Sequence, residues 1–128
     1  MAFSNYLSNE ILDHVFSGNA FTAPSNYYVA LYTVAPSASG GGTEVSASGT
    51  GYVRRTATFT TSATQSTNQS AIEFPTASAS YGTVVAAAVL DASSGGNLLA
   101  FANLTAAKTI GIGDVLRIPA NDLDINLA

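Results

Sequence analysis

YGTVVAAAVLDASSGGNLLAF, residues 81–101, consists of two extended apolar runs joined by a polar turn that contains two glycines. Every side chain from residue 84 to residue 90 is apolar, whereas a strand with one face in water alternates apolar and polar side chains. The stretch therefore predicts a central β-hairpin whose first strand is covered on both faces. The two predicted faces are Val84, Ala86, Ala88 and Leu90 on one side, and Val85, Ala87 and Val89 on the other.

The only other long periodic segment is at the start of the chain, where residues 3–17 predict an amphipathic helix that ends near Gly18. Its apolar stripe must be buried against something, because a surface helix packs its apolar side. If a second sheet covers one face of residues 84–90, then this helix or a neighbouring subunit covers the other, and the small alanines permit close approach. The candidate assembly interface is Phe3, Leu7, Ile11, Val15, Val85, Ala87 and Val89.

The rest of the chain reads as short strands separated by turn residues. Residues 27–33 are aromatic and β-branched, residues 52–62 alternate, and residues 35–51 form a long loop rich in glycine and serine. Strands and helices do not alternate, so a parallel sheet is not expected. The sequence predicts one domain, 1–128, with the helix followed over 27–128 by an antiparallel β-sandwich of about six to eight strands, jelly-roll or immunoglobulin-like.

Composition argues against several classes of function. Only 9% of the residues are charged and the net charge is −4, whereas nucleic-acid binding needs clustered basic residues. Cysteine is absent, which excludes disulfides, thiolate metal sites and cysteine nucleophiles. No apolar stretch reaches the ~20 residues of a membrane-spanning helix. We therefore expect neither a nucleic-acid nor a membrane partner.

No set of residues predicts catalysis, a metal site or a cofactor. His14 is the only histidine and lies within the predicted helix, so a serine-histidine-acid triad or a pair of histidine ligands would lack members. Most aspartates lie at turns, where they bond their own backbone. Residues 121–126, NDLDIN, offer oxygen ligands but lack the glycine and distal glutamate of an EF-hand. A non-enzymatic protein without cofactors is expected.

The six tyrosines have two interpretations. Tyrosine offers apolar area together with a hydroxyl, so these residues form either core packing or a patch that stacks on sugars. A host-glycan receptor-binding module would use the tyrosines together with the 35–51 loop. The candidate receptor or partner contacts are Tyr52, Arg54 and Glu44.

Several stretches together resemble a family of small proteins from tailed bacteriophages and prophages, usually labelled phage tail fibre or minor virion protein. The resembling stretches are YVALYTVAPS, GTEVS, GYVRR, FPTASASYGTVVAAAVLDASSGGNLLAFANL and IGIGDVLRIPANDLDINL. They extend over nearly the whole chain, and the hairpin and the C-terminal stretch are the most specific. The segment SASGGGTEVSASGTG is longer than the corresponding part of the family pattern, so contacts at that tip are expected to differ.

The resemblance implies a structural component of a virion, made in the cytoplasm of the bacterial host and acting through protein-protein assembly. Its partners would be other virion proteins and further copies of itself. A tail location, as a fibre or fibre adaptor, follows the family label, and the alternative is a decoration protein that clamps capsid subunits on the head. The family pattern carries no active-site residues.

Overall fold

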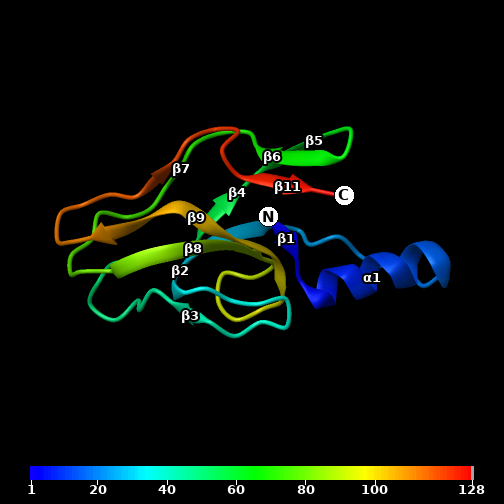
Figure 1. The fold of residues 1–128 in the computed structure, drawn as a ribbon, viewed down its shortest axis with the longest axis horizontal. Coiled ribbons are helices and arrows are strands. Elements are labelled where there is room, and N and C mark those ends of the chain that lie inside the picture. Colours follow the sequence, from blue (N-terminus) through cyan, green and yellow to red (C-terminus); the bar gives the residue numbers. More distant parts are fainter. Residues whose placement is uncertain (128) are drawn as a thin grey trace.

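The structure, a computed structural model, describes residues 1–127 and contains one helix and several antiparallel sheets (Figure 1). The predicted mainly β, sandwich-like architecture with an N-terminal helix is confirmed. The long elements are α1 (Asn5–Phe16), β2 (Tyr27–Val34), β8 (Gly82–Leu90) and β9 (Leu98–Ile110). The short strands are β1 (Ala2–Phe3), β3 (Thr43–Glu44), β4 (Arg55–Ala57), β5 (Phe59–Ser62), β6 (Gln65–Asn68), β7 (Ile72–Glu73), β10 (Arg117–Ile118) and β11 (Asp124–Asn126).

The β8–β9 hairpin forms the middle of the largest sheet, as the sequence predicts. The strand order is β1-β9-β8-β2-β3, and β4 also pairs with β2. Ala87 lies opposite Ala102 on β9, and Ala88 lies opposite Ala30 on β2. The turn is closed by the Asp91 carboxylate, which accepts hydrogen bonds from the backbone and side-chain nitrogens of Asn97. The hairpin therefore has partner strands on both edges and a polar, self-bonded turn.

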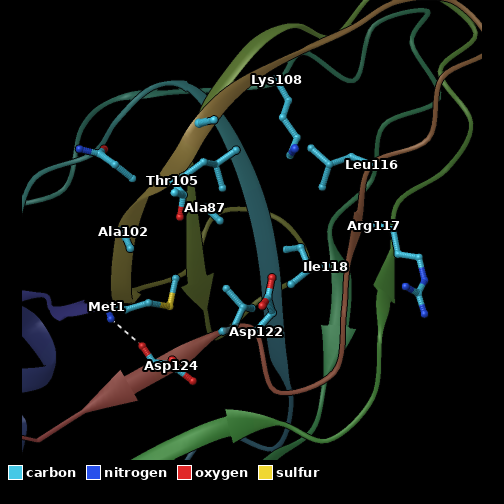
Figure 2. A pocket seen from close by; sticks show the side chains of 14 residues that line it. Met1, Ala87, Ala102, Thr105, Lys108, Leu116, Arg117, Ile118, Asp122 and Asp124 are labelled. Atoms are coloured by element: carbon cyan, nitrogen blue, oxygen red, sulfur yellow. Dashed lines mark hydrogen bonds between the residues drawn. The ribbon is translucent and has the colours of Figure 1, made fainter.

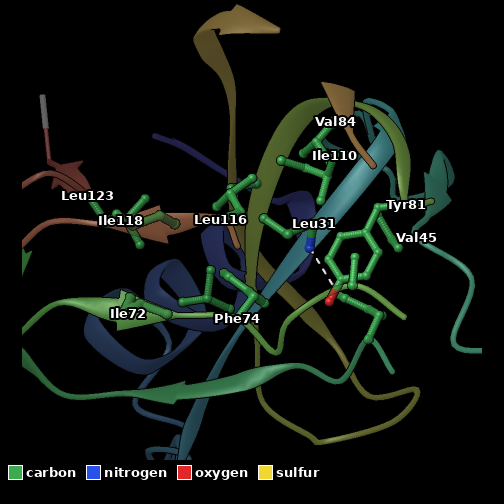
Figure 3. Packing of buried hydrophobic residues seen from close by; sticks show 14 residues of the cluster. Leu31, Val45, Ile72, Phe74, Tyr81, Val84, Ile110, Leu116, Ile118 and Leu123 are labelled. Atoms are coloured by element: carbon green, nitrogen blue, oxygen red, sulfur yellow. Dashed lines mark hydrogen bonds between the residues drawn. The ribbon is translucent and has the colours of Figure 1, made fainter. Parts of the chain in front are cut away.

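One face of this sheet is covered by segments that follow β2 in the chain. Val29, Leu31, Val84 and Ala87 on this face are at most 1% exposed. A layer of side chains, most of them from segments outside the central strands, packs on them (Figure 3). The covering residues are Val45, Tyr52, Ile72, Phe74, Ala77, Tyr81, Ile110, Leu116, Ile118 and Leu123. This is the main core of the protein.

The opposite face is also buried, but not mainly by the helix. Ala30, Ala86 and Ala88 have no exposed area and form a second cluster with Tyr32 and Leu90. The partly buried residues around this cluster are Ala35, Val85, Leu98 and Phe101. As predicted, neither face of β8 is open to water. The helix is not the main cover, because only its base reaches the border of this face, where Asn5 and Tyr6 line a cavity with Tyr32 and Leu90. Cover by a neighbouring subunit stays a prediction.

An irregularity in β8 changes which side chains share a face. Val84 lies opposite Lys108, whereas Ala86, two residues later, lies opposite Asn103. Such a break in register rotates the side chains on either side of it. Val84 consequently packs with Ala87, and Val85 packs beside the other cluster, so the predicted grouping of Val84 with Ala86 is wrong.

The smaller sheets differ most from the sequence prediction. The run 52–62 is broken into β4 and β5, and β5 pairs with β6, which lies in a polar stretch with no strand pattern. β11 pairs with the other edge of β6, and β10 pairs with β7. The strands of the described residues outnumber the six to eight expected, because strands of two or three residues are too short to show a period.

The helix is shorter than predicted and begins at a cap. Ser4 accepts a hydrogen bond from the Leu7 backbone nitrogen at 3.1 Å, which is the usual arrangement at a helix N-cap. The Ser4 hydroxyl also donates to the carbonyl oxygen of Leu98, so this end is tied to β9. Phe3 lies in β1 rather than in the helix, because residues 2 and 3 pair with β9. The helix ends before Gly18, which has a φ of 75°.

The segment 35–51 is more structured than a loop. It contains β3, and both Val45 and Thr50 are buried. Ser37 and Gly40 bond each other through their backbones at 2.9 Å. The chain comes so close to itself at Gly42 that an added Cβ would lie 2.6 Å from the carbonyl oxygen of Val34. Gly40 and Gly42 therefore allow residues 35–51 to fold back compactly.

Candidate functional site

Glu44, Tyr52 and Arg54 form a polar cluster on the edge of the central sheet. Arg54 holds the Glu44 carboxylate with two hydrogen bonds, from Nε at 2.9 Å and from Nη2 at 2.8 Å. The Tyr52 hydroxyl donates to Glu44 Oε2 at 2.7 Å and accepts from the Leu31 backbone nitrogen at 3.0 Å. The structure thus brings together the three residues that the sequence singled out as candidate contacts.

The remaining donors of Arg54 reach the turn of the β8–β9 hairpin. Nη1 donates to the carbonyl oxygens of Ala92 and Gly95, each at 2.8 Å. The Arg54 side chain is 8% exposed and the Glu44 side chain is 26% exposed. A guanidinium has several donors in a fixed plane, and here it bonds β3 and the hairpin turn simultaneously. The cluster therefore connects three parts of the chain that are far apart in sequence.

The ionisation of the cluster is fixed by its contacts. Burial favours a higher pKa of the Glu44 carboxyl, but the hydrogen bonds from Arg54 and Tyr52 outweigh burial and lower this pKa below its ordinary value. Burial and the hydrogen bond to Glu44 raise the pKa of the Tyr52 hydroxyl, which therefore remains a proton donor. The hydrogen bond to Glu44 also raises the pKa of Arg54. The cluster is an ion pair with a neutral tyrosine beside it.

Tyr52 offers little surface to a ligand because it is part of the core. It is 3% exposed, and its ring stacks on Phe74 with centroids 6.1 Å apart and meets Tyr81 edge-on at 5.7 Å. Tyr32 is also buried. The dashed line in Figure 3 marks the hydrogen bond that the Leu31 backbone nitrogen donates to the Tyr52 hydroxyl. In geometry, the cluster is a structural clamp rather than an open binding site.

The helix forms an arm that extends beyond the sheets (Figure 1). The expected apolar stripe is only partly covered: Leu7 and Ile11 are half-buried, and Val15 is 62% exposed. Leu12 and Phe16, which flank the expected row, complete the exposed surface at 56% and 79%. Their spacing of four residues is visible in the sequence and places them on one side of the helix. We call residues 9–17 the helical arm.

The candidate interface residues of the helix and of β8 do not form one surface. Leu7 and Val89 do line one apolar groove, together with Phe21, Tyr27 and Phe59. Ala87 and Val89 are each 1% exposed, and Val85 is half-buried on the opposite side of the sheet. The β8 residues of the candidate interface therefore pack within the protein. Val15, the exposed member of this candidate interface, lies on the helical arm.

A cavity of about 420 Å³ lies between β9 and the C-terminal segment (Figure 2). We call it the β9 cavity. Its walls are part apolar and part polar, and Lys108 and Arg117 border it together with Asp122 and Asp124. Lys108 and Leu116 lie at one end, and Met1 and Asp124 lie at the other (Figure 2). The apolar wall residues include Ala87, Ala102, Leu104, Leu116, Ile118 and Leu123.

A second cavity, of about 410 Å³, lies between the base of α1 and the hairpin turn. Tyr6, Tyr32 and Asn97 line it, and Arg54 lies in its wall. Burial, together with the nearby carboxylates of Glu10 and Asp91, raises the pKa of the Tyr6 hydroxyl, so this tyrosine stays protonated. The cavity combines two aromatic rings with an amide and protonated hydroxyls. We call it the Tyr6 cavity.

The isolated histidine and the aspartates have local structural contacts. His14 Nδ1 lies 3.2 Å from the Phe21 backbone nitrogen, which donates to it, and 3.1 Å from the Asn19 carbonyl oxygen. Asp114 accepts from the Gly111 backbone nitrogen at 2.9 Å, as expected of a turn aspartate. Within residues 1–127, no three histidine, cysteine or acidic side chains gather in a way that could hold a metal ion. No helix in this range has the length and apolarity needed to cross a membrane.

Comparison with protein families identifies a match that covers nearly the whole chain. A family model described as Podophage GP4 fiber I protein gp80 matches residues 2–126. No curated protein matches the chain. The matched range includes the helical arm, the central hairpin and, apart from Met1, the residues that line both cavities.

Proposed function

This chain belongs to the family of the podophage GP4 fiber I protein gp80 and is a tail-associated structural component of a phage virion; within that role we propose that it is a non-enzymatic fibre subunit or fibre adaptor. It acts through protein-protein contacts. Its partners are other virion proteins and further copies of the chain. It is made in the cytoplasm of the bacterial host before it joins the particle.

The exposed helical arm carries this proposal. Phe16 is 79% exposed and Val15 is 62% exposed on a helix that buries none of its residues. Large apolar side chains that are exposed together usually mark a surface that another protein covers. An assembly role accounts for this exposure, because a partner protein would cover the apolar side chains that the chain itself leaves exposed.

Purified virions test the proposal. Quantitative mass spectrometry should detect the chain in a copy number far below that of the major capsid protein, as expected for a tail component. A copy number comparable to that of the capsid protein would instead indicate a decoration protein on the head. Absence of the chain from particles that are otherwise complete would overturn the assembly role altogether.

The Tyr6 cavity favours a second candidate function, recognition of a host glycan. Sugars bind proteins through aromatic rings and through hydrogen bonds to amides and hydroxyls, and Tyr6 and Asn97 supply these groups. Tyr6→Ala should abolish binding on an array of host-surface glycans, and Tyr27→Ala, which changes a tyrosine outside this cavity, should leave it intact. If the native protein binds no glycan on the array, this second function is excluded.

A further inference from the structure

The helical arm lacks the cover that a helix of its length needs. Isolated helices shorter than ~12–15 residues are marginal in water, and most helices in proteins are stabilised by packing an apolar face. Here Leu12 and Phe16, one turn apart, are 56% and 79% exposed. They share one shallow surface with Asp13, and Glu10 lies beside them. The arm therefore presents an apolar contact edged by two carboxylates.

Charges in the rest of the chain indicate where such a surface fits. The chain has four basic residues, and none precedes Arg54. Arg54 is bound to Glu44, and Arg55 donates to the carbonyl oxygen of Glu73 at 3.0 Å. The other two, Lys108 and Arg117, both border the β9 cavity. Lys108 and Arg117 thus lie next to a hollow whose walls combine apolar and polar side chains.

The β9 cavity offers cations to an acidic arm. Lys108 lies at the Leu116 end, whereas Asp124 lies at the Met1 end together with the N-terminal ammonium (Figure 2). An arm that carries Glu10 and Asp13 is attracted to Lys108 and Arg117, and Asp122 and Asp124 disfavour contact with their own carboxylates. Apolar walls such as Leu116 and Ile118 can receive apolar side chains in the same contact.

We propose that the helical arm of one copy docks into the β9 cavity of a second copy, with Leu12 and Phe16 against the apolar wall and Glu10 and Asp13 toward Lys108 and Arg117. The arm does not fill its own cavity, because α1 starts near the Met1 end and extends away from the sheets over ~18 Å (Figure 1). The arm and the cavity are different surfaces, so the contact is head-to-tail. Such contacts close into rings or extend into filaments.

This inference rests on the proposed assembly role and names a second copy of the chain as a partner. Self-association of the purified chain tests the inference separately from the presence of the chain in virions. Sedimentation equilibrium should show concentration-dependent self-association that weakens as salt increases, because the contact includes exposed charges. Phe16→Ser should weaken association at least ~10-fold, as expected for a buried aromatic anchor. Its matched control is Ile112→Ser, which removes an equally exposed apolar side chain, 76% exposed, from a turn outside the arm and the cavity.

A charge exchange tests the contact between the arm and Lys108. Lys108→Glu and Glu10→Lys should each weaken association several-fold, and the double variant should recover most of the loss. Arg55→Glu makes the same change of charge outside the cavity and should have no effect. A chain that remains monomeric at all concentrations would overturn the proposal and leave a different virion protein as the occupant of the arm. Equal effects of Lys108→Glu and Arg55→Glu would also overturn it. Neither outcome would affect detection of the chain in virions, which tests the assembly role.

Discussion

The guanidinium of Arg54 holds the carboxylate of Glu44 at 2.8 Å while its other nitrogen bonds the hairpin turn. The ion pair therefore fixes the turn of β8–β9 to the opposite edge of the sheet, where β3 lies. The helical arm projects from this sheet (Figure 1).

Glu44→Gln should lower the free energy of unfolding by about 2 kcal/mol, the usual range for hydrogen bonds to a charged group. The variant leaves the Arg54 charge, whose side chain is 8% exposed, without its counter-charge. Urea unfolding at neutral pH measures the difference. The control is Glu73→Gln, which removes an exposed carboxylate and should change stability by less than ~0.5 kcal/mol. Equal stability of both variants and the native chain would contradict the clamp.

Acid should remove the stabilisation that the ionised Glu44 carboxylate gives to the fold. The pKa of Glu44 is lower in the folded chain than in the unfolded chain, so its ionisation stabilises the fold above the unfolded value of about 4.3. This stability is lost as the pH falls through the lowered folded pKa. The stability difference between the native chain and Glu44→Gln should therefore shrink as unfolding is measured at pH 7, 4 and 3. A difference that is constant over this range would show that Glu44 is not held ionised by Arg54.

Gly42→Ala should be much more destabilising than Gly41→Ala. Both glycines have a φ of 76°, which costs a residue with a side chain ~1–2 kcal/mol. At Gly42 the new Cβ would also lie 2.6 Å from the Val34 carbonyl oxygen, whereas at Gly41 it meets nothing within 4 Å. Thermal unfolding of the two variants compares them under matched backbone strain. Equal melting temperatures would mean that the fold-back of residues 35–51 is not packed as described.

Ala88→Leu should destabilise the chain by ~1–3 kcal/mol, because it adds volume to a closed layer. Ala88 has no exposed area and lies between Ala30 on β2 and Phe101 on β9. Ala106→Leu makes the same change at an exposed position of β9 and serves as the control. A fully tolerated Ala88→Leu would indicate that the second face of β8 is open.

The central hairpin was predictable because its signal is local and repeated. Seven consecutive apolar residues between turn residues define β8, and the structure buries both of its faces. The exchange of Val84 and Val85 between faces was not predictable, because it arises from a break in register with β9. Short strands such as β6 depend on partners far away in the sequence and leave no period of their own.

The assembly surface could be predicted only in part. The helix was visible from its period, but its direction was not, so the sequence did not show that Val15, at the end of the stripe, would be exposed. Phe16 is exposed because the helix runs away from the sheet, and that direction is set by the Ser4 bonds to β9 rather than by the helix sequence. The Glu44–Arg54 pair lies ten residues apart in sequence, and its contact with the hairpin turn requires the folded sheet.

The location of the chain on the particle tests the central claim most directly. Virions labelled with an antibody against the chain and imaged by electron microscopy should carry label on the tail, and particles with the Phe16→Ser chain should carry less. Particles with the Ile112→Ser chain should be labelled like the native virion. Label distributed over the head, or no label on intact particles, would contradict a tail-associated structural role.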